Sequence, residues 1–201
     1  MLPLGSSAQG WDEILFTALN LAGTNPVVDA LMVLVTTLGA AYIVVLVVVP
    51  LWWRGQREAT FDLLLLLGIT VLLTEAIRFA VDRPRPCLLP GVRTLAGYGC
   101  DVETDPSFPS GHASRAFALA AFVTLRFRWR TGSAATAFAI LVGVSRIYLG
   151  VHWPSDVLAG ALLGVGLALL VELLARRSSG YRNARAKVLS WIPHRRRPAA
   201  A

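Results

Sequence analysis

Two of the three histidines in this 201-residue chain stand in short polar stretches between apolar segments. His112 ends the tetrapeptide Pro-Ser-Gly-His, and His152 stands four residues before Asp156. At a phosphorus atom, one imidazole can attack while another donates a proton to the departing oxygen. If Asp156 lies in the first turn of a helix, this spacing brings its carboxylate near the imidazole of His152, where it stabilises the charged form. His112, His152 and Asp156 are therefore the candidate catalytic residues.

Arginines in the same stretches supply positive charge suited to a bound anion. A guanidinium is permanently charged and presents a planar fork of donors that fits phosphate oxygens. Ser110 and Gly111 precede a predicted helix, whose first amides and dipole favour an anion. Glycine at this place lets the ligand approach the backbone. The candidate phosphate-binding residues are Arg78, Arg85, Ser110, Gly111 and Arg146.

The elements that position these groups are predicted to lie in a membrane. The chain is 55% hydrophobic and only 15% charged, whereas soluble domains carry about a quarter charged residues. The stretch from Leu31 to Trp53 has no charged residue, and roughly 20 helical residues cross a hydrocarbon core. It is too long and too far from the N-terminus for a cleaved signal peptide. A buried helix of a soluble protein is the alternative.

We predict an all-α fold, a polytopic membrane bundle of about five spanning helices preceded by an interfacial helix. Trp11–Leu21 has apolar residues at helical spacing but is too short to cross, so it is the interfacial helix. Residues 1–28 form this N-terminal segment, 29–177 the membrane core and 178–201 a basic tail. The predicted spans are Asp29–Trp53, Thr60–Val81, Ala113–Leu125, Gly132–Leu149 and Ser155–Ala175.

The distribution of Lys and Arg predicts the orientation in a plasma membrane. Basic residues follow the first and third predicted spans and fill the tail, and none precedes the first span. These basic segments are expected in the cytoplasm, which places residues 82–110 and the turn around His152 outside. Arginines in this outer loop break the charge rule, and an anionic ligand explains them better than topology does. The net charge of +7 belongs to clusters that meet anionic headgroups, so nucleic acid is not a predicted partner.

Cys87 and Cys100 both fall in the predicted outer loop. In an oxidising compartment they form a disulfide that closes a short loop beside the candidate site. Two free thiols are the alternative, because spacing along the chain does not establish the geometry that a disulfide needs.

The polar stretches resemble the signature of the type 2 phosphatidic acid phosphatase superfamily. That signature reads Lys-x6-Arg-Pro, then Pro-Ser-Gly-His, then Ser-Arg-x5-His-x3-Asp, and the match runs from about Arg78 to Asp156. The second and third elements match residue for residue and in order. The first departs where Arg78 stands in place of Lys, which keeps the charge but alters how that side chain would contact phosphate.

The resemblance implies a membrane-embedded lipid phosphatase that forms a phosphohistidine. His152 would be the nucleophile and Asp156 would orient it. His112 would be the general acid and then the base that activates water. The resemblance implies neither metal nor cofactor, because arginines and amides neutralise the charge that metal ions neutralise elsewhere. The expected partners are the bilayer and a lipid phosphate or diphosphate; no oligomeric state is predicted.

Two substrate classes remain open, a polyprenyl diphosphate such as undecaprenyl diphosphate and a glycerolipid such as phosphatidylglycerophosphate or phosphatidic acid. A small chain with an outward site resembles the bacterial members that recycle polyprenyl diphosphate. A phosphotransferase using the same phosphohistidine is an alternative function. A non-catalytic lipid-binding protein is another, although its usual mark is a lost histidine and both are present. The related vanadate-dependent haloperoxidases share the anion pocket but are soluble.

Each of these residues also has a structural explanation when taken alone. Arg78 could extend to the interface and pair with Glu75 one turn earlier, and Asp156 could cap a helix. The catalytic interpretation is favoured because all the stretches share one membrane face and the family order. Nearby charges outside the pattern are expected to tune substrate choice: Arg83, Arg93, Glu103, Asp105 and Arg115.

Overall fold

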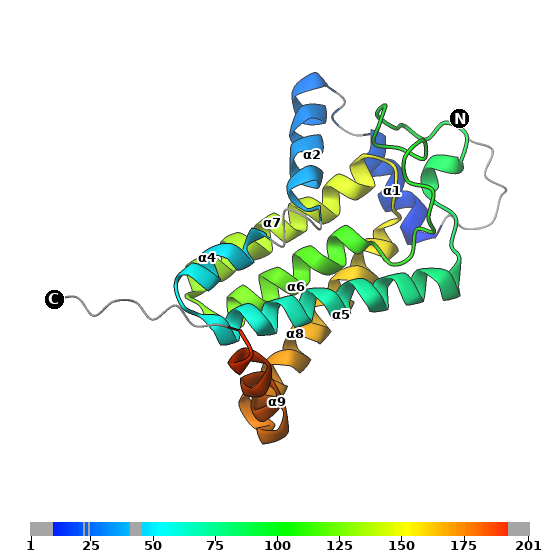
Figure 1. Ribbon diagram of the computed structural model, residues 1–201. Coiled ribbons are helices and arrows are strands. Elements are labelled where there is room, and N and C mark those ends of the chain that lie inside the picture. Colours follow the sequence, from blue (N-terminus) through cyan, green and yellow to red (C-terminus); the bar gives the residue numbers. More distant parts are fainter. Residues whose placement is uncertain (1–9, 22, 24, 41–45, 193–201) are drawn as a thin grey trace.

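The computed structural model describes residues 10–21, 23, 25–40 and 46–192, which fold into a bundle of helices (Figure 1). This part of the chain contains no strand, so the predicted all-α fold is confirmed. In chain order the helices are α1 Trp11–Leu21, α2 Pro26–Leu38, α4 Val48–Trp53, α5 Arg57–Val81, the 3-10 helix η1 Pro86–Leu88, α6 Gly111–Arg126, α7 Trp129–Tyr148, α8 Pro154–Arg177 and α9 Ser179–Ser190.

Helices α5, α7 and α8 are long and apolar enough to cross a membrane. Their surfaces expose large apolar side chains: Leu72 on α5 is 70% exposed and Leu162 on α8 is 67% exposed. Lipid covers such surface at no cost, and a helix satisfies its own backbone polar groups, as a spanning segment must. The bundle therefore has the character predicted for a membrane protein. Helix α6, at the place of the short predicted span, has 16 residues.

The first predicted span is divided in the structure, which differs from the single helix expected over Asp29–Trp53. Asn25 caps helix α2: its side chain accepts hydrogen bonds from two backbone amides at 3.0 Å, and Pro26 fits the first helical position. It ends at Gly39, where a Cβ would lie 2.8 Å from Val142 of α7. Helix α4 follows in another direction (Figure 1), and residues 41–45 lie outside the described part.

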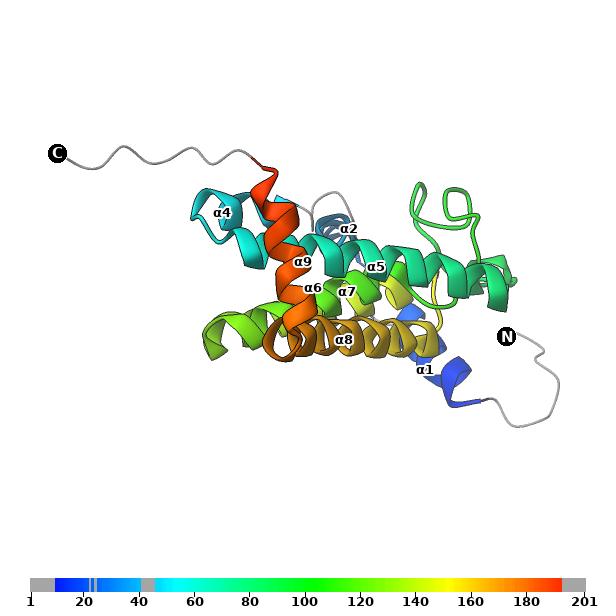
Figure 2. The same cartoon turned by 60° about the horizontal axis from the view of Figure 1, so that its bottom comes forward.

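Helix α6 lies at the centre of the bundle, packed against α5, α7 and α8 (Figure 2). Two glycines on α8 face it. A Cβ on Gly164 would lie 2.2 Å from the backbone oxygen of Ser114, and one on Gly160 would lie 2.6 Å from that of Ser110. Small residues at this spacing let helix backbones approach closely in membranes. As a result the first turn of α8, with Asp156, lies beside the beginning of α6.

The predicted basic tail begins with helix α9, which packs against the bundle; its last nine residues lie outside the described part. Asp62 of α5 is fully buried. Its carboxylate accepts from Arg126 at 2.8 Å, from Tyr181 at 2.6 Å and from Arg185 at 2.7 Å. Because a buried carboxylate is costly without partners, these contacts hold α9 in place.

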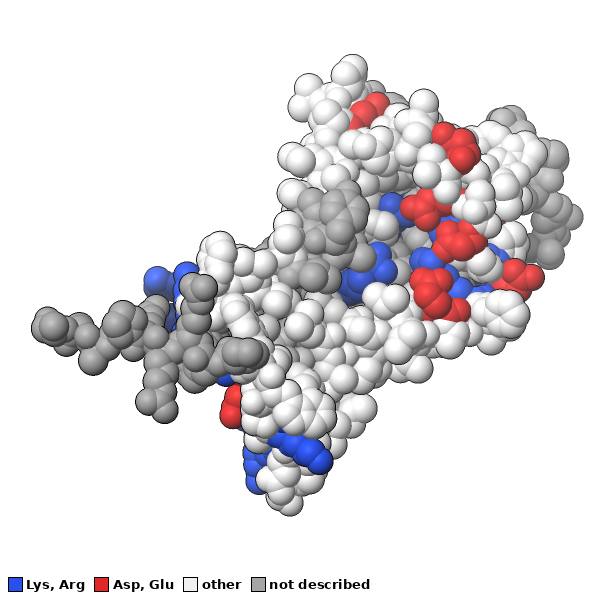
Figure 3. Space-filling view, in the orientation of Figure 1, with Lys and Arg blue, Asp and Glu red and all other residues white. Residues whose placement is uncertain are grey.

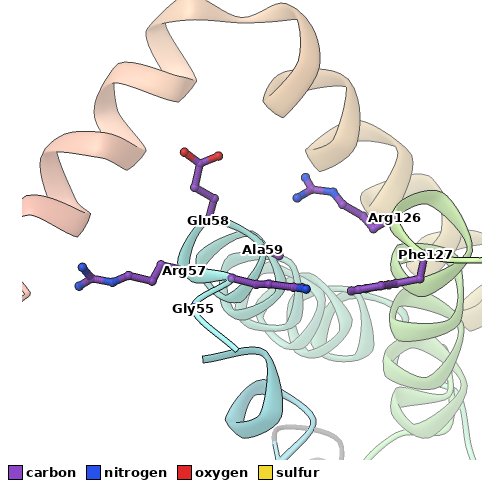
Figure 4. Close-up of a pocket in the computed structure, with 7 residues that line it drawn as sticks. Gly55, Arg57, Glu58, Ala59, Arg126 and Phe127 are labelled. Carbon is purple, nitrogen blue, oxygen red and sulfur yellow. The ribbon is translucent and has the colours of Figure 1, made fainter. Parts of the chain in front are cut away.

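A hollow of about 460 Å³ lies where α5 begins and α6 ends (Figure 4). Glu58 pairs with Arg185 of α9, and Arg126 pairs with Asp62. The side chain of Arg57 points away from Glu58 and Arg126, and it donates to the backbone oxygen of Ile192 at 2.9 Å. The charged side chains around this hollow are thus already engaged in docking α9.

Candidate functional site

The polar stretches meet at the end of the bundle opposite α9, where the loop of residues 82–110 lies. Arg78 donates to the backbone oxygen of Pro109 at 3.2 Å, which joins the first stretch to the second. Ser110 donates its amide proton to the backbone oxygen of Asp156 at 3.0 Å, which joins the second to the third. Basic and acidic side chains lie interleaved in a hollow at this end (Figure 3).

His152 lies in the turn between α7 and α8 and is fully buried. Its Nε2 is 3.2 Å from Nη1 of Arg85, which joins the first stretch to the third. Its Nδ1 is 3.5 Å from Oδ2 of Asp156 and has no hydrogen-bond partner in the described part of the chain. The side chains of His152 and Asp156 are therefore adjacent, as the four-residue spacing predicted.

Asp156 holds two further partners. Its Oδ2 accepts from the amide of Trp153 at 2.8 Å and so caps α8, which means that the helix-capping explanation also holds. Its Oδ1 accepts from Arg83 at 2.7 Å. Arg83 in turn pairs with Asp12 of α1 at 2.8 Å, and Asp12 accepts from the amide of Ser155 at 2.8 Å.

Asp12 and Arg83 therefore support the candidate orienting carboxylate, and the sequence interpretation missed both roles. Arg83 stood out only as a nearby charge expected to tune substrate choice, and Asp12 was not among the candidate residues. Their partners lie 71 to 143 residues away along the chain. No local pattern signals contacts of that range.

The three predicted phosphate-binding arginines are buried, with exposed fractions of 8% for Arg78 and 3% each for Arg85 and Arg146. Arg85 donates to the backbone oxygen of Val151 at 3.0 Å, and Arg146 donates to Thr36 of α2 at 2.9 Å. Buried cations need partners. The fixed neighbours of these guanidinium groups hold them in place beside His152 and the tetrapeptide.

Glu103 and Asp105 complete the charge balance of these arginines. Glu103 pairs with Arg85 at 2.9 Å and also with Arg146, while Asp105 pairs with Arg85 at 2.8 Å and also with Arg78. Burial raises the pKa of the Glu103 carboxyl, but the charges of Arg146 and Arg85 outweigh it and hold that pKa below its usual range. The pKa of Asp105 is lowered in the same way by Arg78 and Arg85. Both carboxylates are therefore ionised, and they contact the same guanidinium groups that a phosphate would use.

Gly111 and His112 form the beginning of α6, where Ser110 is the capping residue and its hydroxyl accepts from the amide of Ala113 at 3.5 Å. A Cβ on Gly111 would lie 3.0 Å from nitrogens of both Arg78 and Arg115. Glycine is therefore the residue that fits between these two cations. His112 follows it, at the same end of the bundle as the other predicted residues.

The remaining loop charges and cysteines have structural partners. Cys87 and Cys100 form a disulfide, with their Cα atoms 5.7 Å apart, so the first of the two alternatives holds. Arg93 pairs with Asp29 of α2 and lies 5.0 Å above the ring of Tyr148. It ties the loop to α2 and α7.

Two further observations bear on the kind of site this is. A cavity of about 470 Å³ borders Arg85 and Glu103 from the loop side, and its lining includes neither His112 nor His152. In the described part of the chain no group of three or more His, Cys, Asp and Glu side chains could hold a metal ion. The predicted residues that meet at this end of the bundle are arginines, histidines and Asp156, together with the loop carboxylates Glu103 and Asp105.

The pH dependence of activity should reflect the surroundings of His152. Burial lowers its pKa well below the ordinary value, and the charges of Arg146, Arg85 and Arg78 lower it further. A lowered pKa keeps the imidazole neutral, the form that the predicted nucleophile needs, down to more acidic pH. The acid limb of kcat/KM that belongs to His152 is therefore expected below pH of about 6.5, the ordinary histidine pKa.

The Arg146→Gln variant tests whether this acid limb comes from His152 or from ionisation of the substrate phosphate. The variant removes the charge that, after burial, lowers the pKa of His152 most. The limb should then move to higher pH, whereas the pKa of the substrate phosphate stays where it was. A limb at the same pH in both proteins would contradict the assignment to His152.

Comparisons with known proteins agree with this geometry. A model of the PAP2 superfamily matches residues 59–179. Undecaprenyl-diphosphatase BcrC of Bacillus subtilis is 30% identical over 163 residues, which cover 79% of this chain and 80% of that protein. Phosphatidylglycerophosphatase B of Bacillus subtilis is 31% identical over 181 residues, covering 83% of this chain and 84% of the relative.

Two crystal structures share the fold. LpxE of Aquifex aeolicus superposes with a TM-score of 0.72 at 28% identity, over 80% of this chain and 94% of that one. A transmembrane PAP2-type phosphatidylglycerolphosphate phosphatase from Bacillus subtilis has a TM-score of 0.68 at 29% identity, over 84% of this chain and 86% of its own. The family resemblance read from the polar stretches is confirmed: the chain belongs to the PAP2 superfamily.

Proposed function

We propose that this protein hydrolyses a lipid phosphate or diphosphate through a phosphohistidine on His152, at the outer face of the membrane. One observation carries the proposal: a buried imidazole has Arg85 beside Nε2 and the carboxylate of Asp156 beside Nδ1. The relatives support the class of reaction, since their names describe phosphatases of undecaprenyl diphosphate, phosphatidylglycerophosphate and lipid A.

The first step forms a bond from His152 to phosphorus. Nδ1 faces Asp156 and keeps its proton, so the lone pair of Nε2 faces the arginines and attacks. As the nitrogen–phosphorus bond forms, the bond from phosphorus to the leaving oxygen breaks. His112 donates a proton to that oxygen.

The second step releases phosphate. His112, now neutral, takes a proton from a water molecule whose oxygen attacks the phosphorus. The nitrogen–phosphorus bond breaks, and its electron pair returns to Nε2 of His152. Inorganic phosphate leaves, and both imidazoles regain their initial protonation.

In the proposed mechanism an entering phosphate competes with carboxylates of the loop for the same arginines. Arg78, Arg85 and Arg146 already contact the carboxylates of Glu103 or Asp105. An entering phosphate presents more oxygens and more charge to each guanidinium fork than a carboxylate does. It therefore displaces those carboxylates from the arginines.

The distribution of charge supports the proposed orientation. The site lies at one end of the bundle and α9 at the other (Figure 1). Helix α6 ends at Arg126, with Arg128 and Arg130 directly after it, and α9 itself is basic. The bias of Lys and Arg toward the cytoplasm supports an orientation with α9 inside and the site outside.

A substrate panel tests the proposal. Purified protein in detergent is offered a polyprenyl diphosphate, phosphatidylglycerophosphate and phosphatidic acid, with and without a chelator, and released phosphate is measured. We expect release from at least one lipid at a rate that the chelator leaves unchanged. A 32P label that is recovered on His152 after acid-free quenching identifies the intermediate. Label that passes to another lipid or a sugar in place of water indicates a phosphotransferase, and no turnover of any lipid contradicts both.

A further inference from the structure

Arg115 differs from the other arginines around the site. Its Nε is buried without a hydrogen-bond partner, and it forms no ion pair with any residue in the described part of the chain. The others at this end of the bundle each pair with a carboxylate: Arg78, Arg83, Arg85, Arg93 and Arg146. An unpaired guanidinium in a partly buried place is free to bind an anionic ligand.

The side chain of Arg115 points back to the beginning of α6. Its Nη1 is 3.0 Å from the position that a Cβ on Gly111 would occupy, and Nη2 of Arg78 is equally close to that point. Helical side chains lean toward the helix N-terminus, which accounts for this reach. Two like charges that flank a residue without a side chain repel each other, and an anion between them removes the repulsion.

A chain of contacts runs from His152 to Arg115. Arg85 contacts His152, Asp105 links Arg85 to Arg78, and Arg78 reaches Arg115 across Gly111. The attacking and leaving atoms of a phosphoryl transfer stand roughly in line on opposite sides of phosphorus. His112, three residues before Arg115, shares a helix face with it, and in the proposed mechanism His112 acts on the leaving group.

We propose that Arg115 binds the phosphate that stays on the leaving group, and so favours lipid diphosphates over lipid monophosphates. The inference rests on the proposed function. When a diphosphate is cleaved, the leaving group is a lipid phosphate whose negative charge grows as the bond breaks, and a guanidinium stabilises it. When a monophosphate is cleaved, the leaving group is an alcohol, which needs a proton from His112 and has no second phosphate.

The test compares two substrates that share one isoprenoid chain, a polyprenyl diphosphate and the corresponding monophosphate. Arg115→Gln should lower kcat/KM for the diphosphate by about 100-fold, the scale of losing one transition-state donor. For the monophosphate the loss in kcat/KM should be less than about fivefold, because its leaving group has no second phosphate for Arg115 to bind. His112→Ala should show the opposite preference and slow the monophosphate more, because an alcohol leaves poorly without a proton.

Arg115→Lys is the second variant. It keeps the charge but loses the planar fork, so its diphosphate rate should fall between wild type and Arg115→Gln. Arg130→Gln is the matched control, since Arg130 is exposed at the opposite end of the bundle. Thermal unfolding of each purified variant shows whether it is folded. If Arg115→Gln is unfolded, the comparison of substrates is made with Arg115→Lys.

Equal losses for both substrates, or no loss for the diphosphate, would overturn the role of Arg115. These outcomes are distinct from failure of the proposed function. In that case the wild-type protein releases phosphate from neither lipid, whatever residue stands at position 115.

Discussion

His152→Ala is expected to reduce phosphate release by roughly 10⁴-fold or more, because loss of a nucleophile removes the covalent route altogether. This imidazole lies between Arg85, beside its Nε2, and Asp156, beside its Nδ1. Phosphate release from a diphosphate lipid, and 32P retained on the protein, should both fall to background. Turnover equal to wild type would exclude His152 as the nucleophile.

The control for this variant has to separate chemistry from folding, because His152 is fully buried. Truncation leaves a cavity, and such cavities typically cost a few kcal/mol. His152→Asn fills more of that space and is equally unable to form phosphohistidine. Both variants should elute from size exclusion as the wild type does, and both should be inactive. Activity in the asparagine variant alone would indicate that the loss in the alanine variant is structural.

Asp156→Asn should lower kcat by about 10²- to 10⁴-fold, the range expected when an orienting carboxylate loses its charge. Asparagine can still accept from the amide of Trp153, so the cap of α8 is kept. It no longer stabilises an imidazolium, and its amide no longer forms an ion pair with Arg83. Because Asp156 does not contact the phosphate in the proposed mechanism, KM should change little.

Separate measurement of kcat and KM checks this expectation. A variant with wild-type kcat would show that the 3.5 Å approach of Asp156 to His152 has no catalytic role. A rise in KM at constant kcat would indicate that Asp156 acts on substrate binding. Asp156→Glu is the companion variant, since it keeps the charge but moves the carboxylate one methylene farther from the backbone.

The sequence was sufficient where local spacing determines geometry. His152 and Asp156 are four residues apart and are neighbours across the first turn of α8, as predicted. The four-residue spacing of Gly160 and Gly164 is typical of helix packing in membranes, but it did not show that α8 contacts α6 at these residues. The family signature then correctly indicated which distant stretches meet.

Features that depend on tertiary contacts could not be predicted in the same way. The end of α2 lies where Gly39 closely approaches Val142 of α7, and the continuous run of apolar residues gave no sign of this break. Asp62 lies inside a predicted span, yet only the folded chain shows that α9 supplies its partners. The pairing of Glu103 with Arg85 and Arg146 depends on the path of an irregular loop, which hydrophobic periodicity does not describe.

The contact between α1 and the site limits how far such a protein can be shortened and still work. The family model begins at residue 59, yet Asp12 holds both Arg83 and the first turn of α8. A shortened protein cut to the matched region would retain every signature residue and lose this brace. A chimaera that exchanges N-terminal segments between relatives would need an acidic residue at the equivalent place in the donor segment to restore it.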